Sequence, residues 1–187
     1  MFYTAKLKMT SALLGVVRGK NQIRTLLRDR DFNVVVPLDH WQWAVTESLS
    51  TMNREGDLDS ECLREILPFA APTTVEHRRN FKVGGAPKQE VFEAVRAGAV
   101  LTVNVLASTA VPKERQKQSS TRLMPPDEKD VADILHCIGK FYGISQWGNK
   151  YQYGRFSLLE LERATPAEIA SILGLPSTAV KTDTKKE

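Results

Sequence analysis

Residues 139–162 read GKFYGISQWGNKYQYGRFSLLELE, and three kinds of local structure meet in this stretch. It begins at the end of an amphipathic pattern, passes Gly143, Gly148 and Gly154, and ends in an apolar run over residues 155–161. Glycine allows a positive φ and lets a ligand approach the main chain closely. We therefore expect a helix, a glycine-rich loop and a strand, in that order.

The side chains of this loop suit a nucleic acid. Lys150 and Arg155 offer positive charge to phosphates, while Trp147, Tyr151 and Tyr153 offer flat rings on which bases stack. An ordinary helix-to-strand connection with turn glycines explains the same residues equally well. The sequence leaves both interpretations open.

The segment before the loop has helical periodicity. Apolar residues recur at helical spacing in the order Val131, Ile134, Leu135, Ile138 and Phe141. Asp127 follows two prolines and is well placed to cap the start of this helix. The pattern predicts a helix whose apolar side packs on a sheet, and Cys137 within it is expected to be a buried thiol.

Two further strands are expected upstream of that helix. Residues 99–107, AVLTVNVLA, form a nearly continuous apolar run rich in valine, which is typical of a central strand. Residues 90–95 have the composition of a strand, and residues 96–98 of a turn. Together these segments predict a β-hairpin.

The N-terminal residues 2–10 alternate between apolar and polar, which predicts a strand with one buried face. Lys6 and Lys8 fall on the other face. These lysines either form a solvated surface or contact phosphates of a bound nucleic acid.

The following segments predict a mainly helical connection. We expect a short helix at 21–28, a short strand at 32–36, a longer helix opened by Pro37, and another short helix at 60–67. The longer helix carries an apolar stripe that is typical of a core-facing helix.

Two polar segments interrupt the predicted elements. Residues 68–89 form an insertion with the basic cluster His77, Arg78, Arg79 and Lys82. We expect a surface loop or hairpin there, either solvated or laid on a phosphate backbone. Residues 109–124 are basic and rich in serine, and we expect a flexible loop.

The bulk composition fits one globular domain. The chain has 187 residues and a net charge of +4, a mild basic excess compatible with an anionic partner. We expect a domain over 1–163, then a short helix and a disordered tail over 164–187. The two distant cysteines form neither a metal-binding motif nor a disulfide framework, and no apolar run is long enough to span a membrane. We expect a cytoplasmic protein that binds no metal, cofactor, membrane or small-molecule substrate.

The order of elements is strand, helices, strand, strand, helix, strand. This order predicts an α+β fold of the ferredoxin-like type, also seen in RRM domains, with a four-stranded antiparallel sheet and helices on one face. The aromatic RNA-binding signature of RRM domains is missing from the sequence.

Two segments resemble the RAMP superfamily, whose members bind or process guide RNA in the CRISPR complexes of antiviral defense. Residues 93–106, EAVRAGAVLTVNVL, resemble its hairpin of a glutamate-bearing strand, a glycine turn and an apolar strand. Residues 139–156 resemble its glycine-rich loop, although Ser145 and Gln146 stand where glycine and basic residues are more typical. A phage or mobile-element relative fits equally well.

The resemblance implies an RNA- or single-stranded nucleic-acid-binding subunit of a ribonucleoprotein assembly, with other protein subunits as partners. The residues expected to contact the nucleic acid are Lys6, Lys8, Arg78, Arg79, Lys82, Gly139, Gly143, Gly148, Lys150, Gly154 and Arg155. The glycines would let the RNA backbone approach the protein main chain closely, and the basic side chains would neutralise phosphates.

Two alternatives remain at this level. One is a metal-independent endoribonuclease that processes guide RNA, with His40 or His77 as the candidate general acid–base group. His136 lies within the apolar helical pattern and is expected to be structural. The other alternative is a non-catalytic adaptor protein of a phage or mobile element, in which the glycine loop only connects elements.

Overall fold

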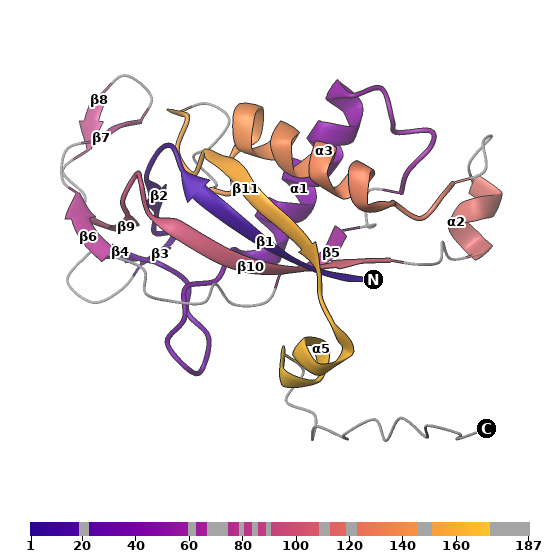
Figure 1. The fold of residues 1–187 in the computed structure, drawn as a ribbon. Coiled ribbons are helices and arrows are strands. Elements are labelled where there is room, and N and C mark those ends of the chain that lie inside the picture. Colours follow the sequence, from indigo (N-terminus) through magenta and orange to yellow (C-terminus); the bar gives the residue numbers. More distant parts are fainter. Residues whose placement is uncertain are drawn as a thin grey trace, which may run out of the picture.

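The computed structural model has an α+β fold, as the sequence predicts (Figure 1). It describes residues 1–18, 23–59, 63–66, 75–78, 81–83, 86–88, 91–108, 113–118, 123–145 and 151–172. A larger sheet packs against two helices, and a second, smaller sheet extends from one end of it.

The larger sheet has four strands in the order β11-β1-β10-β5, and every neighbouring pair is antiparallel. Its strands are β11 (Phe156–Arg163), β1 (Phe2–Met9), β10 (Val100–Ala107) and β5 (Leu63–Ile66). The predicted central strand is confirmed, since β10 lies between β1 and β5.

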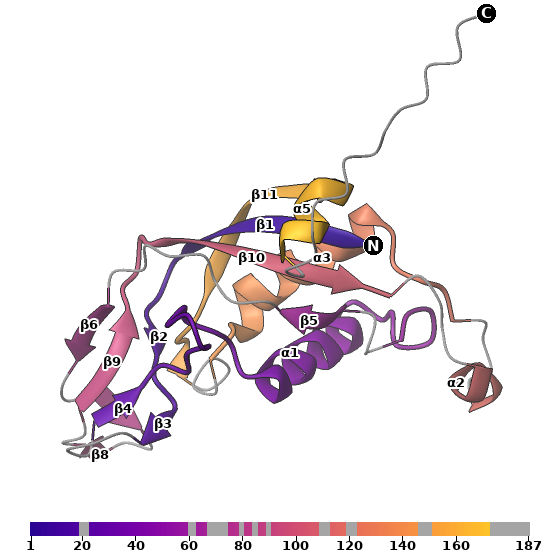
Figure 2. The ribbon, with the colours of Figure 1, turned by 90° about the horizontal axis from the view of Figure 1, so that it is seen from below.

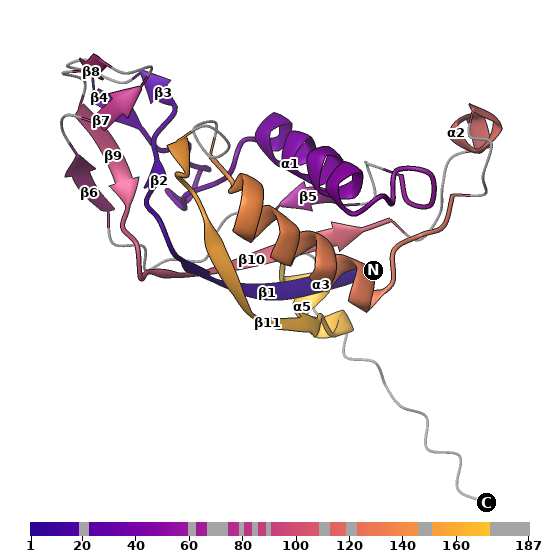
Figure 3. The ribbon, with the colours of Figure 1, turned by 90° about the horizontal axis from the view of Figure 1, so that it is seen from above.

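One face of this sheet is buried under two helices that lie side by side, α1 (Leu38–Thr51) and α3 (Glu128–Cys137) (Figures 1 and 3). The apolar side of β1 and the matching side of β10 are almost fully buried, as their alternating patterns predict. The Trp41 indole donates to the carbonyl of Leu63 over 3.1 Å, which ties α1 to β5. The core therefore lies between the sheet and this helix pair.

The second sheet consists of short strands gathered around β9. They are β2 (Leu13–Leu14), β9 (Val91–Val95), β4 (Ile23–Thr25), β3 (Val17–Arg18) and β6 (Val75–Arg78). A separate hairpin pairs β7 (Phe81–Val83) with β8 (Ala86–Lys88), so the described parts of the basic insertion are extended (Figure 1).

The two sheets share one bent antiparallel ladder. Lys8 pairs with Val100 in the larger sheet, and Leu13 pairs with Val95 in the smaller sheet in the same register. At the bend, the amide of Gly98 donates to the carbonyl of Met9 over 2.7 Å. The predicted hairpin between 90–95 and 99–107 is therefore wrong, because β9 and β10 each pair with the N-terminal strand pair instead of with each other.

Other sequence predictions are also overturned. Residues predicted as helices at 21–28 and 60–67 include β4 and β5, because pairing with β9 and β10 outweighs their local helical periodicity. The segment predicted as a strand at 32–36 is a loop with one isolated bridge, and the loop predicted at 109–124 contains α2 (Lys113–Gln118).

The ends of the helices follow the sequence more closely. Asp127 caps α3 through a reciprocal pair of hydrogen bonds with Asp130, and Cys137 is buried as expected. The helix continues as a π-helix, η2 (Ile138–Tyr142), and α5 (Pro166–Ile172) follows the last strand. Within the described part of the chain, no helix is long and apolar enough to span a membrane.

Candidate nucleic-acid interface

The end of the glycine-rich stretch is anchored to the bend between the two sheets. The amides of Thr10 and Ser11 donate to the Arg155 carbonyl over 2.9 and 3.3 Å, and the Arg155 amide donates to Ser11 Oγ over 2.8 Å. The Gly154 amide donates to the carbonyl of Ala12 over 2.8 Å. These bonds hold the start of β11 against the end of β1.

The glycines in this stretch make close backbone contacts within the protein. A Cβ at Gly139 would overlap the carbonyl oxygen of Phe156, and one at Gly154 would lie 2.8 Å from the backbone nitrogen of Ser145. Gly143 has a φ of 72° and faces the carbonyl of Tyr153. Intramolecular packing accounts for all three glycines, which is the connector interpretation of these residues.

The Arg155 side chain turns back onto the helix that precedes the loop. Its guanidinium donates to the carbonyl of Lys140, one of the acceptors left open at the end of η2, and its buried Nε has no partner. Desolvation lowers the pKa of Arg155, although nearby Tyr142 opposes this effect. Arg155 therefore stabilises the loop and keeps its charge beside it.

A surface groove of about 540 Å³ opens at this junction. It is lined by residues from the end of α3, from η2, from the loop end, from β11 and from the segment just after β1: Thr10, His136, Gly139, Lys140, Gln152, Arg155, Phe156, Ser157 and Leu158. Gln152 has a left-handed φ of 60°, a strained conformation for a residue with a Cβ. Two predicted site residues, Gly139 and Arg155, are thus brought together here.

The groove has the electrostatics of an anion site. His136 and Lys140 are exposed beside the Arg155 guanidinium, and no acidic residue is among the described residues that line the groove. Lys8 is opposite Ser157 in the β1–β11 ladder, but it lies on the exposed face of β1 with Lys6 and is not among the residues that line the groove. This arrangement suits a phosphate group.

Aromatic side chains lie next to the groove on η2. Phe141 is 45% exposed, and the Lys140 ammonium lies 5.0 Å from the centre of its ring. Tyr142 packs edge-to-face against Trp43 of α1, with ring centres 5.7 Å apart. Cations and exposed rings in one place are the combination with which proteins bind single-stranded nucleic acids.

The remaining predicted contact residues do not line this groove. Lys6 forms an ion pair with Glu160 over 2.5 Å, and this hydrogen bond raises the pKa of Lys6. Arg78 and Lys82 belong to β6 and β7, where only the backbone is described. Arg79, Gly148 and Lys150 lie outside the described residues.

The three histidines lie in different elements. The sequence predicts a packed or partly exposed structural histidine at position 136, and the structure has His136 exposed and lining the groove. His40 lies in the first turn of α1, 3.9 Å from a carboxylate oxygen of Asp39, and His77 belongs to β6. The signal that could have identified His136 is its spacing, since it lies between the inward positions Leu135 and Cys137 of the helical stripe.

No protein-family profile matches the chain, and a search of curated proteins finds no match. Within the described residues, no group of three or more histidine, cysteine, aspartate or glutamate side chains is arranged to hold a metal ion. The site is therefore interpreted from its own geometry.

Proposed function

We propose that this protein is an RNA- or single-stranded nucleic-acid-binding subunit of a ribonucleoprotein assembly, similar to RAMP proteins. The observation that carries the proposal is the groove at the end of η2, with His136, Lys140 and Arg155 on its walls and no acid among its described lining residues. Such a site attracts a chain of phosphates by charge.

We also propose that the domain is ferredoxin-like. The main elements follow one another along the chain in the order βαββαβ, as β1, α1, β5, β10, α3 and β11. The sheet order β11-β1-β10-β5 is the one expected for a ferredoxin-like domain. The second sheet is then an extension of the bent ladder. This architecture supports the resemblance to RAMP proteins without depending on the glycines.

The groove is a better nucleic-acid contact than the outer face of the sheet. On that face, the charge of Lys6 is neutralised by Glu160, and Glu162 is also exposed. Beside the groove, the exposed ring of Phe141 is accessible to a base while Lys140 contacts phosphate. The proposal therefore shifts the main contact from the sheet face and the glycine backbone to the end of η2.

Fluorescence anisotropy with a labelled single-stranded RNA tests this proposal. Lys140→Glu reverses a charge in the groove, and Lys6→Glu makes the same change outside it. We expect Lys140→Glu to weaken binding by at least about tenfold and to reduce the slope of log K against log salt by about one or more. Equal effects of the two variants, or no binding by the wild type at low salt, would refute the groove as the site.

A second candidate function, metal-independent endoribonuclease, is favoured by the position of His136. An exposed imidazole beside Lys140 and Arg155 has the components for acid–base cleavage with charge stabilisation. We expect the wild-type protein to leave a labelled RNA uncut in the presence of a chelator. Cleavage that is lost in His136→Ala but kept in His40→Ala would establish the enzyme instead.

A further inference from the structure

The loop between β4 and α1 presents an exposed aromatic side chain on an ordered backbone. Phe32, at its tip, is 78% exposed and has a φ of 64°. A left-handed conformation is disfavoured for a bulky residue and is usually occupied by glycine or asparagine. Backbone strain of this kind is found where a residue has a role beyond folding.

Hydrogen bonds fix the conformation of the tip. The carboxylate of Asp29 accepts from the backbone amides of Asp31 and Asn33 over 2.9 and 2.8 Å, and from the Asn33 side chain over 3.1 Å. The Phe32 amide donates to the Asp29 carbonyl over 3.2 Å. The ring is therefore presented without the entropy cost of ordering a mobile loop on binding.

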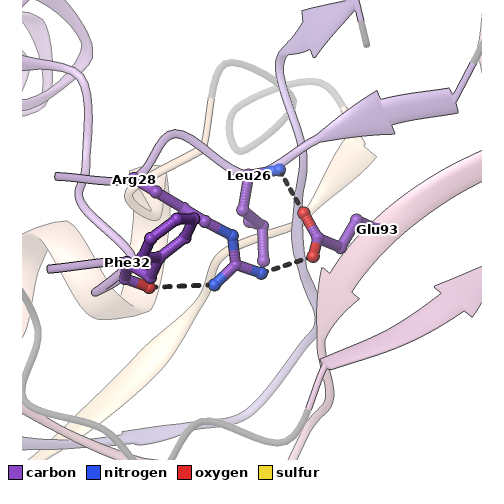
Figure 4. Close-up of polar contacts among 4 residues, drawn as sticks. All are labelled: Leu26, Arg28, Phe32 and Glu93. Atoms are coloured by element: carbon purple, nitrogen blue, oxygen red, sulfur yellow. Dashed lines mark hydrogen bonds and ion pairs between the residues drawn. The ribbon is translucent and has the colours of Figure 1, made fainter. Parts of the chain in front are cut away.

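The base of the loop is fixed to the second sheet (Figure 4). The Glu93 carboxylate of β9 accepts from the Leu26 amide over 2.8 Å and pairs with the Arg28 guanidinium. The other guanidinium nitrogen, Nη1, donates to the Phe32 carbonyl over 3.0 Å. A partly buried carboxylate thus positions the residue at the tip through Arg28.

Folding itself gives no reason for a phenylalanine at the tip. Glycine would relieve the backbone strain, and the ring gains little burial within the chain. The exposed neighbours Arg30 and Asp31 carry opposite charges, and Asp29 adds another acid. This mixed charge suits a protein surface better than a polyanion.

The same chain has an apolar pocket that could accept an aromatic ring. A pocket of about 410 Å³ lies between the start of β1 and α5, and it is lined by Met1, Phe2, Arg163, Ala164, Thr165, Pro166 and Ile169. Most of these side chains are apolar, and Arg163 is exposed at this site. A phenylalanine ring with an aspartate beside it is complementary to an apolar pocket with an arginine.

We propose that Phe32 of one copy of this chain inserts into the β1–α5 pocket of a second copy, with Asp31 facing Arg163. In Figure 1 the loop and α5 both protrude below the sheets, and in Figure 2, seen from below, both are turned toward the viewer. A loop and a helix that protrude on the same side of a molecule allow a two-fold dimer, in which each copy supplies both the Phe32 loop and the pocket beside α5. This inference does not depend on nucleic-acid binding.

Sedimentation velocity of the full chain, from about 10 μM to about 1 mM, measures the association, since two small contacts give a weak dimer. Phe32→Gly removes both rings from the dimer and Ile169→Arg blocks both pockets. We expect each change to weaken association by about 100-fold or more. Met124→Ala, which removes another exposed apolar side chain elsewhere, serves as the control and should associate like the wild type.

Two complementation tests distinguish this contact from a loss of folding. A mixture of Phe32→Gly and Ile169→Arg chains retains one intact contact and should form a heterodimer weaker than the wild-type dimer. Asp31→Arg and Arg163→Asp should each weaken association, and the double variant should restore it. Thermal melting should show that Phe32→Gly is at least as stable as the wild type, because glycine relieves the backbone strain at this position.

Three results would overturn the proposal. The first is a wild type that stays monomeric throughout the concentration range. The second is a Phe32→Gly variant that associates like the wild type. The third is a double charge reversal that does not restore association. A monomeric chain whose RNA affinity falls in Phe32→Gly would assign the ring to nucleic acid and would likewise reject the dimer.

Discussion

A comparison of two glycines tests whether the glycine-rich loop is built by intramolecular packing. Gly143 and Gly98 both have a positive φ, of 72° and 89°. A Cβ at Gly98 would meet no atom within 4 Å, whereas a Cβ at Gly143 would lie 2.6 Å from the carbonyl oxygen of Tyr153. Replacing each glycine by alanine therefore compares a position in open space with one that is closely packed.

The expected difference follows from these contacts. For alanine at Gly98 the positive φ costs about 1 kcal/mol, whereas Gly143, with a φ of 72° and a ψ of 172°, lies in a region that is essentially restricted to glycine and costs about 1–3 kcal/mol. At Gly143, separating two packed backbone segments adds about 1–3 kcal/mol, comparable to overpacking an interior. The free energy of unfolding should fall by about 2–6 kcal/mol in Gly143→Ala and by about 1 kcal/mol in Gly98→Ala.

Thermal melting followed by circular dichroism measures the effect. For a domain of this size each kcal/mol lowers Tm by about 2–4 °C, so we expect a loss of about 2–4 °C for Gly98→Ala and about 5–25 °C for Gly143→Ala. Equal losses would refute the packing argument. A Gly143→Ala protein with an unchanged Tm and a reduced affinity for RNA would instead support close approach of a ligand to this glycine.

Two further predictions concern the Phe32 loop and its base. Glu93→Gln should lower the free energy of unfolding by about 2 kcal/mol, because the Glu93 side chain is only 14% exposed and its charge is paired with Arg28. Glu160→Gln, on the surface, should lower it by at most about 0.5 kcal/mol. Urea denaturation measures both free energies, and equal losses would contradict this prediction. Desolvation tends to raise the pKa of Asp29, but hydrogen bonds from Asn33 and Asp31 lower it below its ordinary 3.8. The stabilisation by this carboxylate is present above pH 3.8 and is lost as the pH falls through the lowered pKa. The difference in Tm between the wild type and Asp29→Ala should therefore become smaller in acid. A difference that becomes larger in acid would contradict this prediction.

The sequence could predict those elements whose patterns depend on burial of one face or on local caps. The alternation of residues 2–10 became β1, the valine-rich run became β10, and the stripe after Asp127 became α3 with its capping hydrogen bonds. These signals are local, because a side chain's neighbours at spacing two or three to four determine the face on which it lies.

Short segments and pairing partners were decided by tertiary contacts. Residues 23–25 and 63–66 are strands because neighbouring strands supply hydrogen-bond partners, whereas β9 leaves its expected hairpin because the ladder bends at Gly98. Local periodicity contains no information about distant partners, so it could not distinguish these outcomes.

The candidate site shows the same division. The sequence by itself pointed to the glycine stretch, to Arg155 and to a nucleic acid, because residue type alone indicates charge and backbone freedom. Only the tertiary structure placed Phe156 and Tyr153 against Gly139 and Gly143, and turned Arg155 onto the end of η2. It also brought exposed His136 into the groove, because the direction of a side chain depends on which helix face the sheet covers.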